Sequence, residues 1–245
     1  MGRAAGAIRR YRSRYRPRSE RGGISLSARV AGSSSTPGLW SDAPRQPRHL
    51  RLRIIAGDLG GRFIDAPRGT RTRPTAERVR EAWFSALAGD LEGSRVADLY
   101  AGSGALGFEA LSRGAAYVHF VESDRRAVAL LHRNVAMLDL ANRSRVVRDD
   151  ALAWVRGLHE PDDGAGPGAP LDLVFADPPY ASTGGARLVE RFRARPFASQ
   201  LWVEHRPDAE LAAAADWTRE YGDTCVSRFR APADASTRTL SRGTR

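Results

Sequence analysis

Short apolar stretches alternate with amphipathic segments from Ser94 onward, and this alternation constrains the fold of the chain more than any other feature. Strands that alternate with helices build a parallel sheet whose strands are joined by crossover helices. Two further stretches, 217–221 and 224–229, have the spacing of an antiparallel pair that closes the sheet. We therefore predict an α/β fold for residues 94–231. The predicted parallel strands span 95–100, 117–122, 145–148, 171–176 and 200–204.

A different pattern precedes this region, and we interpret residues 50–93 as a small N-terminal module of a β-hairpin and a helix. Residues 51–56 and 62–65 flank a glycine-rich turn, which predicts the hairpin. Thr75, preceded by Pro74, predicts the N-cap of the helix. The apolar residues of this helix fall on one face, which predicts that it packs on a core. They are Val79, Trp83, Phe84 and Leu87.

Both ends of the chain lack apolar periodicity. Residues 1–49 are rich in Arg, Ser, Gly and Pro, and we expect them to be disordered, as we expect for residues 232–245. The positive charge lies almost entirely at the N-terminus: residues 1–53 carry 13 Arg and 2 acids, a net of +11, which equals the net charge of the whole chain. Three interpretations of the extension stay open: an RNA-binding arm, a solvated tail without function, or sequence upstream of a misassigned start codon.

The composition excludes several kinds of site. A single cysteine, Cys225, excludes an intramolecular disulfide and a multi-cysteine zinc site, and we predict no metal. No stretch approaches the roughly 18 apolar residues that a membrane helix needs. The Arg-rich N-terminus lacks the apolar segment of a secretory signal. We therefore expect a cytoplasmic protein that has no membrane partner and is a monomer.

The first predicted strand of the sheet leads into a glycine-rich turn, Asp98-Leu-Tyr-Ala-Gly102-Ser-Gly104-Ala-Leu-Gly107. Glycines at this spacing let the backbone turn sharply and approach a ligand closely, but the spacing alone suits a dinucleotide equally well. Asp98 favours a different ligand, because its carboxylate would repel a pyrophosphate and attract the cationic amino-acid group of S-adenosylmethionine (SAM). A nucleotide-binding oxidoreductase is the alternative against which Asp98 argues.

Acidic residues follow the next two predicted strands and support SAM as the cofactor. Glu122 lies 20 residues after Gly102, a reach at which a carboxylate accepts both ribose hydroxyls. Asp150 is placed to accept a hydrogen bond from the adenine amino group, with the N–H of Ala151 available to a ring nitrogen. Each acid has the alternative role of a helix N-cap. The predicted cofactor contacts are Asp98, Ala101, Gly102, Ser103, Gly104, Glu122, Ser123, Asp150 and Ala151.

The tetrapeptide Asp177-Pro178-Pro179-Tyr180 follows the fourth predicted strand and indicates the chemistry. The Asp177 carboxylate and the Pro178 carbonyl can each accept one N–H of a planar amino group, which would aim the nitrogen lone pair at a methyl donor. Pro179 would stiffen the turn, and Tyr180 would stack on the planar base that carries the amino group. The simpler alternative is a strand end followed by a turn, because Asp and Pro are common turn residues.

Several motifs together resemble the bacterial 16S rRNA (guanine(966)-N2)-methyltransferase family, RsmD, over residues 51–230. They are Arg53-Ile-Ile-Ala-Gly57, Gly61-Arg62, Arg73-Pro-Thr75, Arg78-Val-Arg-Glu81, the glycine-rich turn, Glu109-Ala-Leu-Ser-Arg-Gly-Ala115 and Asp177-Pro-Pro-Tyr180. The resemblance implies a Rossmann-like class I SAM-dependent methyltransferase domain that follows an RNA-contacting hairpin and helix. It also implies methylation of the exocyclic N2 of one guanine in 16S rRNA during small-subunit assembly, with residues 177–180 as the transfer site.

Other targets and an RNA-binding role stay open from the residues alone. An adenine-N6 or a protein-glutamine methyltransferase uses a similar strand-end motif, and a nonenzymatic RNA-binding assembly protein could retain the same fold. The arginines of the N-terminal module would contact phosphates, although a solvated helix face is the alternative for Arg78 and Arg80. The predicted RNA contacts are Arg53, Arg62, Arg71, Arg73, Arg78 and Arg80.

Overall fold

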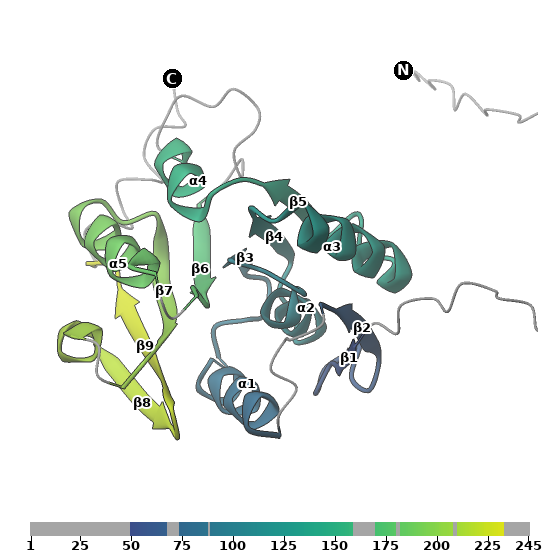
Figure 1. The fold of residues 1–245 in the computed structure, drawn as a ribbon, viewed down its shortest axis with the longest axis horizontal. Helices are drawn as coiled ribbons and strands as arrows, with labels where there is room; N and C mark the ends of the chain where they lie inside the picture. Colours follow the sequence, from purple (N-terminus) through teal and green to yellow (C-terminus); the bar gives the residue numbers. More distant parts are fainter. Residues whose placement is uncertain are drawn as a thin grey trace, which may run out of the picture. The chain divides into compact units, whose positions relative to one another are not determined.

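A computed structural model describes residues 50–67, 74–87, 89–158, 170–179, 182–207 and 210–232 (Figure 1). These residues belong to one compact unit, Gln46–Arg245. The predicted extension at 1–49, the tail after residue 232, and the predicted contacts Arg71, Arg73 and Tyr180 lie outside the described residues. In the described ranges, no helix is both long enough and apolar enough to cross a membrane.

A seven-stranded sheet forms the centre of this unit. Its strands are β3 (Arg95–Leu99), β4 (Tyr117–Glu122), β5 (Ser144–Arg148), β6 (Leu171–Ala176), β7 (Ala198–His205), β8 (Trp217–Tyr221) and β9 (Thr224–Arg230). They lie in the order β5-β4-β3-β6-β7-β9-β8. Strands β3 to β7 run parallel, and β9 pairs antiparallel with both β7 and β8. The predicted α/β fold and its antiparallel closing pair are confirmed.

Helices connect the parallel strands in chain order. They are α2 (Ala105–Ser112), α3 (Arg125–Leu138), α4 (Ala151–Gly157) and α5 (Gly184–Ala194). The side chain of Asp124 caps α3 by accepting the N–H groups of Arg126 and Ala127. A 3₁₀ helix, Glu210–Ala214, precedes β8 and was not predicted from the sequence.

The N-terminal module contains β1 (Leu50–Arg53), β2 (Phe63–Ala66) and helix α1 (Pro74–Ala86). Strands β1 and β2 pair antiparallel, which confirms the predicted hairpin. The prediction that Thr75 is the N-cap is wrong, because α1 already includes Pro74. Proline suits the first position of a helix, where its missing N–H would have no acceptor within the helix.

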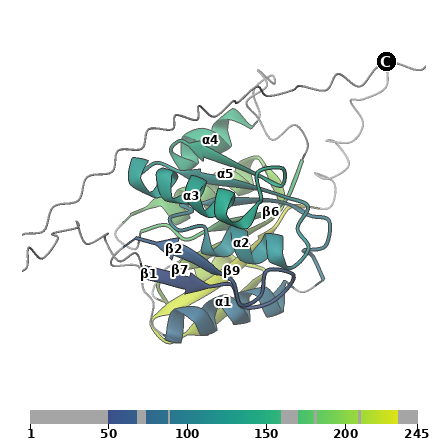
Figure 2. The ribbon, with the colours of Figure 1, turned by 90° about the vertical axis from the view of Figure 1, so that its right-hand side faces the viewer.

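Helices lie on both sides of the central sheet (Figures 1 and 2), and an apolar cluster lies beneath each layer of helices. The first joins the hairpin and helices α1, α2 and α3 to one face. The second joins α4 and α5 to the other face. Helix α1 contributes Trp83 and Phe84, both fully buried, and their rings contact Phe175 of β6 with centroids 5.8 and 5.7 Å away. The N-terminal module therefore packs on the same core as the sheet.

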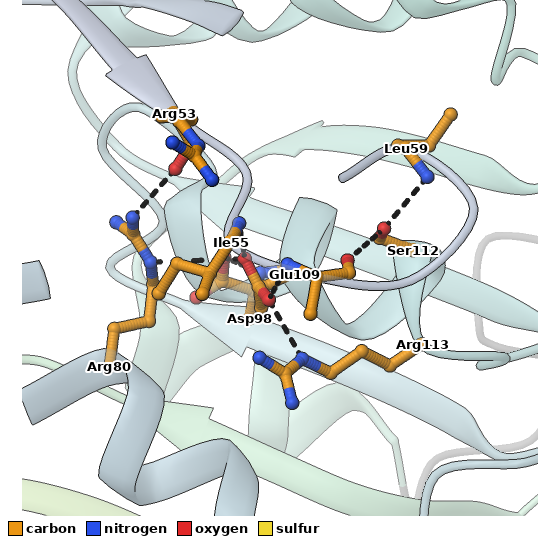
Figure 3. Close-up of polar contacts among 10 residues, drawn as sticks. Arg53, Ile55, Leu59, Arg80, Asp98, Glu109, Ser112 and Arg113 are labelled. Carbon is orange, nitrogen blue, oxygen red and sulfur yellow. Dashed lines mark hydrogen bonds and ion pairs between the residues drawn. The ribbon is translucent and has the colours of Figure 1, made fainter. Parts of the chain in front are cut away.

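Glu109 on α2 anchors the end of the hairpin through a buried carboxylate (Figure 3). The N–H of Ile55 donates to Glu109 Oε2 at 2.8 Å, and the N–H of Ala56 donates to Oε1 at 3.1 Å. Arg113 Nε donates to Oε1 at 2.7 Å, and Arg80 Nε lies 4.0 Å from Oε2. One acidic side chain thus joins the hairpin, α1 and α2.

Ser112, the last residue of α2 and about one turn after Glu109, holds the hairpin turn. Its hydroxyl accepts the N–H of Leu59 at 2.9 Å and donates to the carbonyl of Ala56. Gly57 permits this close approach: its φ is +82°, and a Cβ at this position would lie 1.8 Å from the Ser112 carbonyl oxygen. The hairpin turn and α2 are therefore in direct backbone contact, and no side chain fits between them.

Candidate cofactor and transfer site

The carboxyl ends of the parallel strands bring the predicted site residues to one edge of the sheet. Leu99 of β3 pairs with Val121 of β4 on one side and with Ala176 of β6 on the other. These three strands therefore end side by side. They place the glycine-rich turn, Glu122 and Asp177 next to one another at this edge. Open α/β sheets bind their ligands at the carboxyl edge.

The glycines of the turn have different roles in the structure. Gly102 has a φ of +54°, and a Cβ at this position would approach only the Tyr100 carbonyl oxygen, at 3.9 Å, so its face is open. Gly104, with a φ of +83°, would place a Cβ 2.5 Å from the Phe108 ring, and Gly107 would place one 2.3 Å from Phe120. Gly107 thus allows α2 to pack on β4, and Gly104 makes room for side chains of α2 and α3, whereas Gly102 leaves room for a ligand.

Asp98 is buried beneath this turn, with 2 % of its surface exposed. Its carboxylate accepts the N–H of Gly107 at 2.9 Å. Burial raises the pKa of Asp98 well above its ordinary value; the hydrogen bond from Gly107 opposes this shift, and the charges of Asp177 and Glu122 add to it. The charges of Asp177 and Glu122 thus act on Asp98 at this edge, an arrangement that a cation would stabilise.

Replacing Asp98 with asparagine should change how stability depends on pH. Between the ordinary pKa of 3.8 and the raised value, the folded protein keeps a proton that the unfolded chain releases, so the Asp98 contribution to stability falls as pH rises. Asparagine does not titrate, and the free energy of unfolding of Asp98→Asn relative to wild type should therefore rise with pH. Urea unfolding from about pH 4 to about pH 8 measures this. If the difference in the free energy of unfolding between Asp98→Asn and wild type does not change with pH, the raised pKa of Asp98 is contradicted.

Glu122 ends β4 and joins the glycine-rich turn to the start of α3. Its Oε2 accepts the N–H of Gly102 at 2.9 Å, and its Oε1 accepts the N–H of Asp124 at 2.8 Å. The hydroxyl of Ser123 lies 3.5 Å from Oε1. Each carboxylate oxygen has two lone pairs, so the half-buried Glu122 can accept further hydrogen bonds from ligand hydroxyls.

Asp150 is exposed and is the N-cap of α4, where its Oδ1 accepts the N–H of Ala153 at 2.9 Å. One carboxylate oxygen of Asp150 therefore has the alternative role that the sequence suggested, that of a helix cap. Ala151 is buried as the first residue of α4. The adenine contact predicted for Asp150 requires its remaining acceptor positions and stays a prediction.

Residues 177–179 leave β6 at the same edge. Asp177 and Pro179 are exposed, whereas Pro178 is buried. The N–H and the hydroxyl of Ser182 both donate to the Pro179 carbonyl at 2.8 Å, which closes the turn before α5. The structure thus exposes the Asp177 carboxylate beside the glycine-rich turn, as the predicted transfer role requires.

Tyr100 belongs to this edge and was not predicted from the sequence. It follows β3 with a φ of +58°, a conformation that is rare for a bulky side chain. Its half-buried side chain reaches α5, where a Cβ on Gly184 would lie 2.6 Å from the hydroxyl. Burial raises the pKa of Tyr100, the Asp150 charge raises it further, and Arg187 lowers it. Tyr100 therefore lies within electrostatic range of Asp150 and packs against the apolar cluster of α4 and α5.

The predicted RNA-contacting arginines divide into two groups. Arg53, Arg62 and Arg78 are exposed, and Arg62 donates to the Met137 carbonyl at 3.1 Å. The Arg80 side chain is only 10 % exposed and donates to the Arg53 carbonyl at 2.7 Å. Burial lowers the pKa of Arg80, and the charge of Glu109 opposes this shift. The inward position of Arg80 supports a structural role and does not favour the predicted phosphate contact.

Comparisons with known proteins show which family the chain resembles. Residues 52–222, well over half of the chain, match the family model described as Conserved hypothetical protein 95. The chain belongs to this family, RsmD. A putative rRNA methyltransferase of Bacillus subtilis, YlbH, is 40% identical over 129 residues, which cover 53% of this chain and 67% of the relative. Ribosomal RNA small subunit methyltransferase D of Escherichia coli is 39% identical over 139 residues, 56% of this chain and 65% of the relative, so that alignment spans just under two thirds of the E. coli protein.

Solved structures confirm the fold of this RsmD-family chain. The structure of a putative methyltransferase from E. coli, yhhF, covers 75% of this chain and 99% of its own, with 30% identity and a TM-score of 0.62. A putative methylase from Haemophilus influenzae, HI0767, covers 74% and 98% with 26% identity and a TM-score of 0.58. The METTL16 methyltransferase domain shares the fold alone, at 15% identity and a TM-score of 0.52. The predicted Rossmann-like fold of class I methyltransferases is confirmed.

Proposed function

We propose that this chain transfers a methyl group from SAM to the exocyclic N2 of a guanine in 16S rRNA during assembly of the small ribosomal subunit. The observation that carries the proposal is the exposed Asp177 at the end of β6, next to the open face of Gly102 in a chain of the RsmD family. A cytoplasmic monomer is part of the same proposal. The domain limits 50–93 and 94–231 stay predictions.

The edge of the sheet fits SAM in both shape and charge. Gly102 leaves space where a side chain would otherwise stand. Asp98 and Glu122 place acids beneath and beside this space, which suits a ligand with an ammonium and a sulfonium group. Glu122 would hold the ribose hydroxyls, and Asp150 the adenine amino group. When bound, SAM supplies an electrophilic methyl group on its sulfonium.

Asp177 and Pro178 would orient the target nitrogen. A base amino group is a weak nucleophile because its lone pair is delocalised into the ring. If the Asp177 carboxylate and the Pro178 carbonyl each accept one N–H, the lone pair is directed away from them toward the methyl donor. The same two acceptors stabilise the positive charge that develops on nitrogen, and this is the electrostatic part of catalysis.

The relatives favour ribosomal RNA as the substrate over other amino groups. Two of them are named as an rRNA methyltransferase and a ribosomal RNA small subunit methyltransferase. Adenine N6 and protein glutamine also present planar amino groups, and the geometry of Asp177 and Pro178 alone does not distinguish them. The proposal that guanine N2 is the target atom therefore depends on membership of the RsmD family.

Methyl transfer from radiolabelled SAM tests the proposal directly. We expect label to enter RNA of small-subunit particles that lack the modification, and not RNA from particles that already carry it. Protein from the same particles serves as the control for glutamine methylation. Label in protein alone, or in neither fraction, would contradict the proposed function.

Replacing Glu122 with glutamine should weaken SAM binding by about tenfold or more, because hydrogen bonds to a charged acceptor contribute about 1.5–3 kcal/mol each. Glutamine keeps one acceptor oxygen for the backbone of Gly102 or Asp124, which limits the structural damage. Calorimetric titration with SAM measures the affinity, and Glu190→Gln on the exposed surface of α5 is the matched control. If Glu122→Gln and wild type bind SAM with equal affinity, Glu122 does not hold the ribose.

A further inference from the structure

The outer face of the hairpin carries an exposed aromatic ring among arginines. Side chains alternate along β2, so that Ile64 is buried and Phe63 points outward. Arg53 pairs directly with Phe63 across the two strands, and Arg51 lies on the same face. Both arginines are exposed. Asp65, half-buried, lies on the same face opposite Arg51. This two-stranded face thus carries one aromatic, two cationic and one acidic side chain.

Phe63 is 42 % exposed and is one of two large apolar side chains so exposed in the described part of the chain, together with Met137. The Arg51 guanidinium lies 4.7 Å from the centre of the Phe63 ring. A single exposed apolar residue is common on protein surfaces, and an exposed contact with a guanidinium is by itself weak. An aromatic ring and a guanidinium plane on a sheet are, however, the surfaces on which proteins stack unpaired RNA bases.

Asn134 of α3 fixes this hairpin relative to the glycine-rich turn. Its buried side chain accepts the N–H of Asp65 at 2.9 Å and donates to the carbonyls of Asp65 at 2.9 Å and Ser103 at 3.2 Å. Asp65 belongs to β2, and Ser103 lies between Gly102 and Gly104. One amide group therefore connects the strand that carries Phe63 to the turn at the candidate site.

We propose that the hairpin face of Arg51, Arg53 and Phe63 is a stacking site for one unpaired nucleotide of the RNA substrate. The base stacks on the Phe63 ring or on the Arg51 guanidinium that covers it, and the exposed Arg53 contacts an adjacent phosphate. Two arginines against one acid, Asp65, leave this face with a net positive charge, which favours a polyanion such as RNA as the occupant. This stacking site rests on the proposed function, because it would hold a second part of the same RNA substrate, away from the base that is methylated.

Replacing Phe63 with alanine in the full-length chain tests the stacking site. Base stacking on an aromatic side chain contributes about 1–3 kcal/mol, so the dissociation constant for unmodified small-subunit RNA should rise by about tenfold. Phe63→Trp should restore the affinity, whereas Phe63→Leu should not, because leucine is apolar but has no ring. Met137→Ala is the matched control and should bind RNA like wild type. SAM affinity should be the same in all four variants.

Direct RNA binding separates this inference from the proposed function. The affinity is measured by filter binding without SAM, so it can be read whether or not methyl transfer occurs. Wild-type affinity of Phe63→Ala, or full rescue by Phe63→Leu, would overturn the stacking site and leave the proposed methyl transfer intact. Binding that weakens in Phe63→Ala while wild type transfers no methyl group would support the stacking site and contradict the proposed reaction. Wild-type protein that does not bind the RNA would contradict both.

Discussion

Asp177→Ala should transfer methyl groups at least 100-fold more slowly than wild type, because one positioned acceptor in a reaction site contributes about 10²–10³ in rate. The side chain is exposed at the end of β6, so its loss should leave the fold intact. Asp177→Asn keeps one acceptor oxygen and should retain part of the activity. Single-turnover transfer from radiolabelled SAM to unmodified small-subunit RNA gives the rate of the chemical step.

The matched control for this variant is Glu190→Ala. Glu190 is an exposed acid on α5 and has no role in the proposed reaction. Its loss should change the transfer rate by no more than about twofold, because substitutions away from special features are usually mild. Equal rates for Asp177→Ala and Glu190→Ala would show that the strand-end acid does not act in catalysis.

Glu109→Ala should destabilise the protein by about 3–5 kcal/mol, the cost of removing one partner of a buried ion pair. The carboxylate is completely buried and accepts hydrogen bonds from Ile55, Ala56 and Arg113. Without it, two backbone N–H groups lose their acceptor, and the inward-facing Arg80 loses its nearest opposite charge. Urea unfolding at neutral pH measures the change in free energy.

Glu81→Ala provides the comparison, because Glu81 is an exposed acid on α1. It should change the free energy of unfolding by less than about 0.5 kcal/mol. A Glu109→Ala variant as stable as Glu81→Ala would mean that the hairpin is not held by this carboxylate. Glu109→Ala should also reduce RNA binding, since the hairpin that carries Phe63 would lose its attachment to α2.

Local patterns were sufficient to predict the sheet. Most of the strands are largely apolar runs such as 171–176, which are recognisable because a buried parallel strand needs apolar residues on both faces. The predicted limits of the central sheet differ most at β7, which spans 198–205 and not 200–204. The start of α1 was placed wrongly at Thr75, because the frequency of Thr as an N-cap was given more weight than the preference of proline for the first position of a helix. The short helix at 210–214 has no amphipathic period that would have predicted it.

Contacts between segments that are distant in the chain could not be predicted from local sequence patterns. The structure shows that Gly104 and Gly107 make room for side chains packed against them, whereas the sequence pattern predicted a ligand contact for Gly104 as well as for Gly102. Arg80 and Arg78 look alike in the sequence, but only Arg80 turns inward, toward a carboxylate 29 residues away in the chain. Tyr100 was missed because its left-handed backbone conformation is a property of the folded turn.

Mass spectrometry of the methylated nucleoside tests the central claim most directly. Unmodified small-subunit particles are incubated with the protein and SAM, the RNA is digested to nucleosides and to oligonucleotides, and both are analysed. The account predicts a single methyl group on the exocyclic N2 of guanosine, at one position, and its absence when Asp177→Ala replaces wild type. Methylated adenosine, or RNA that gains no methyl group while SAM is bound, would contradict it.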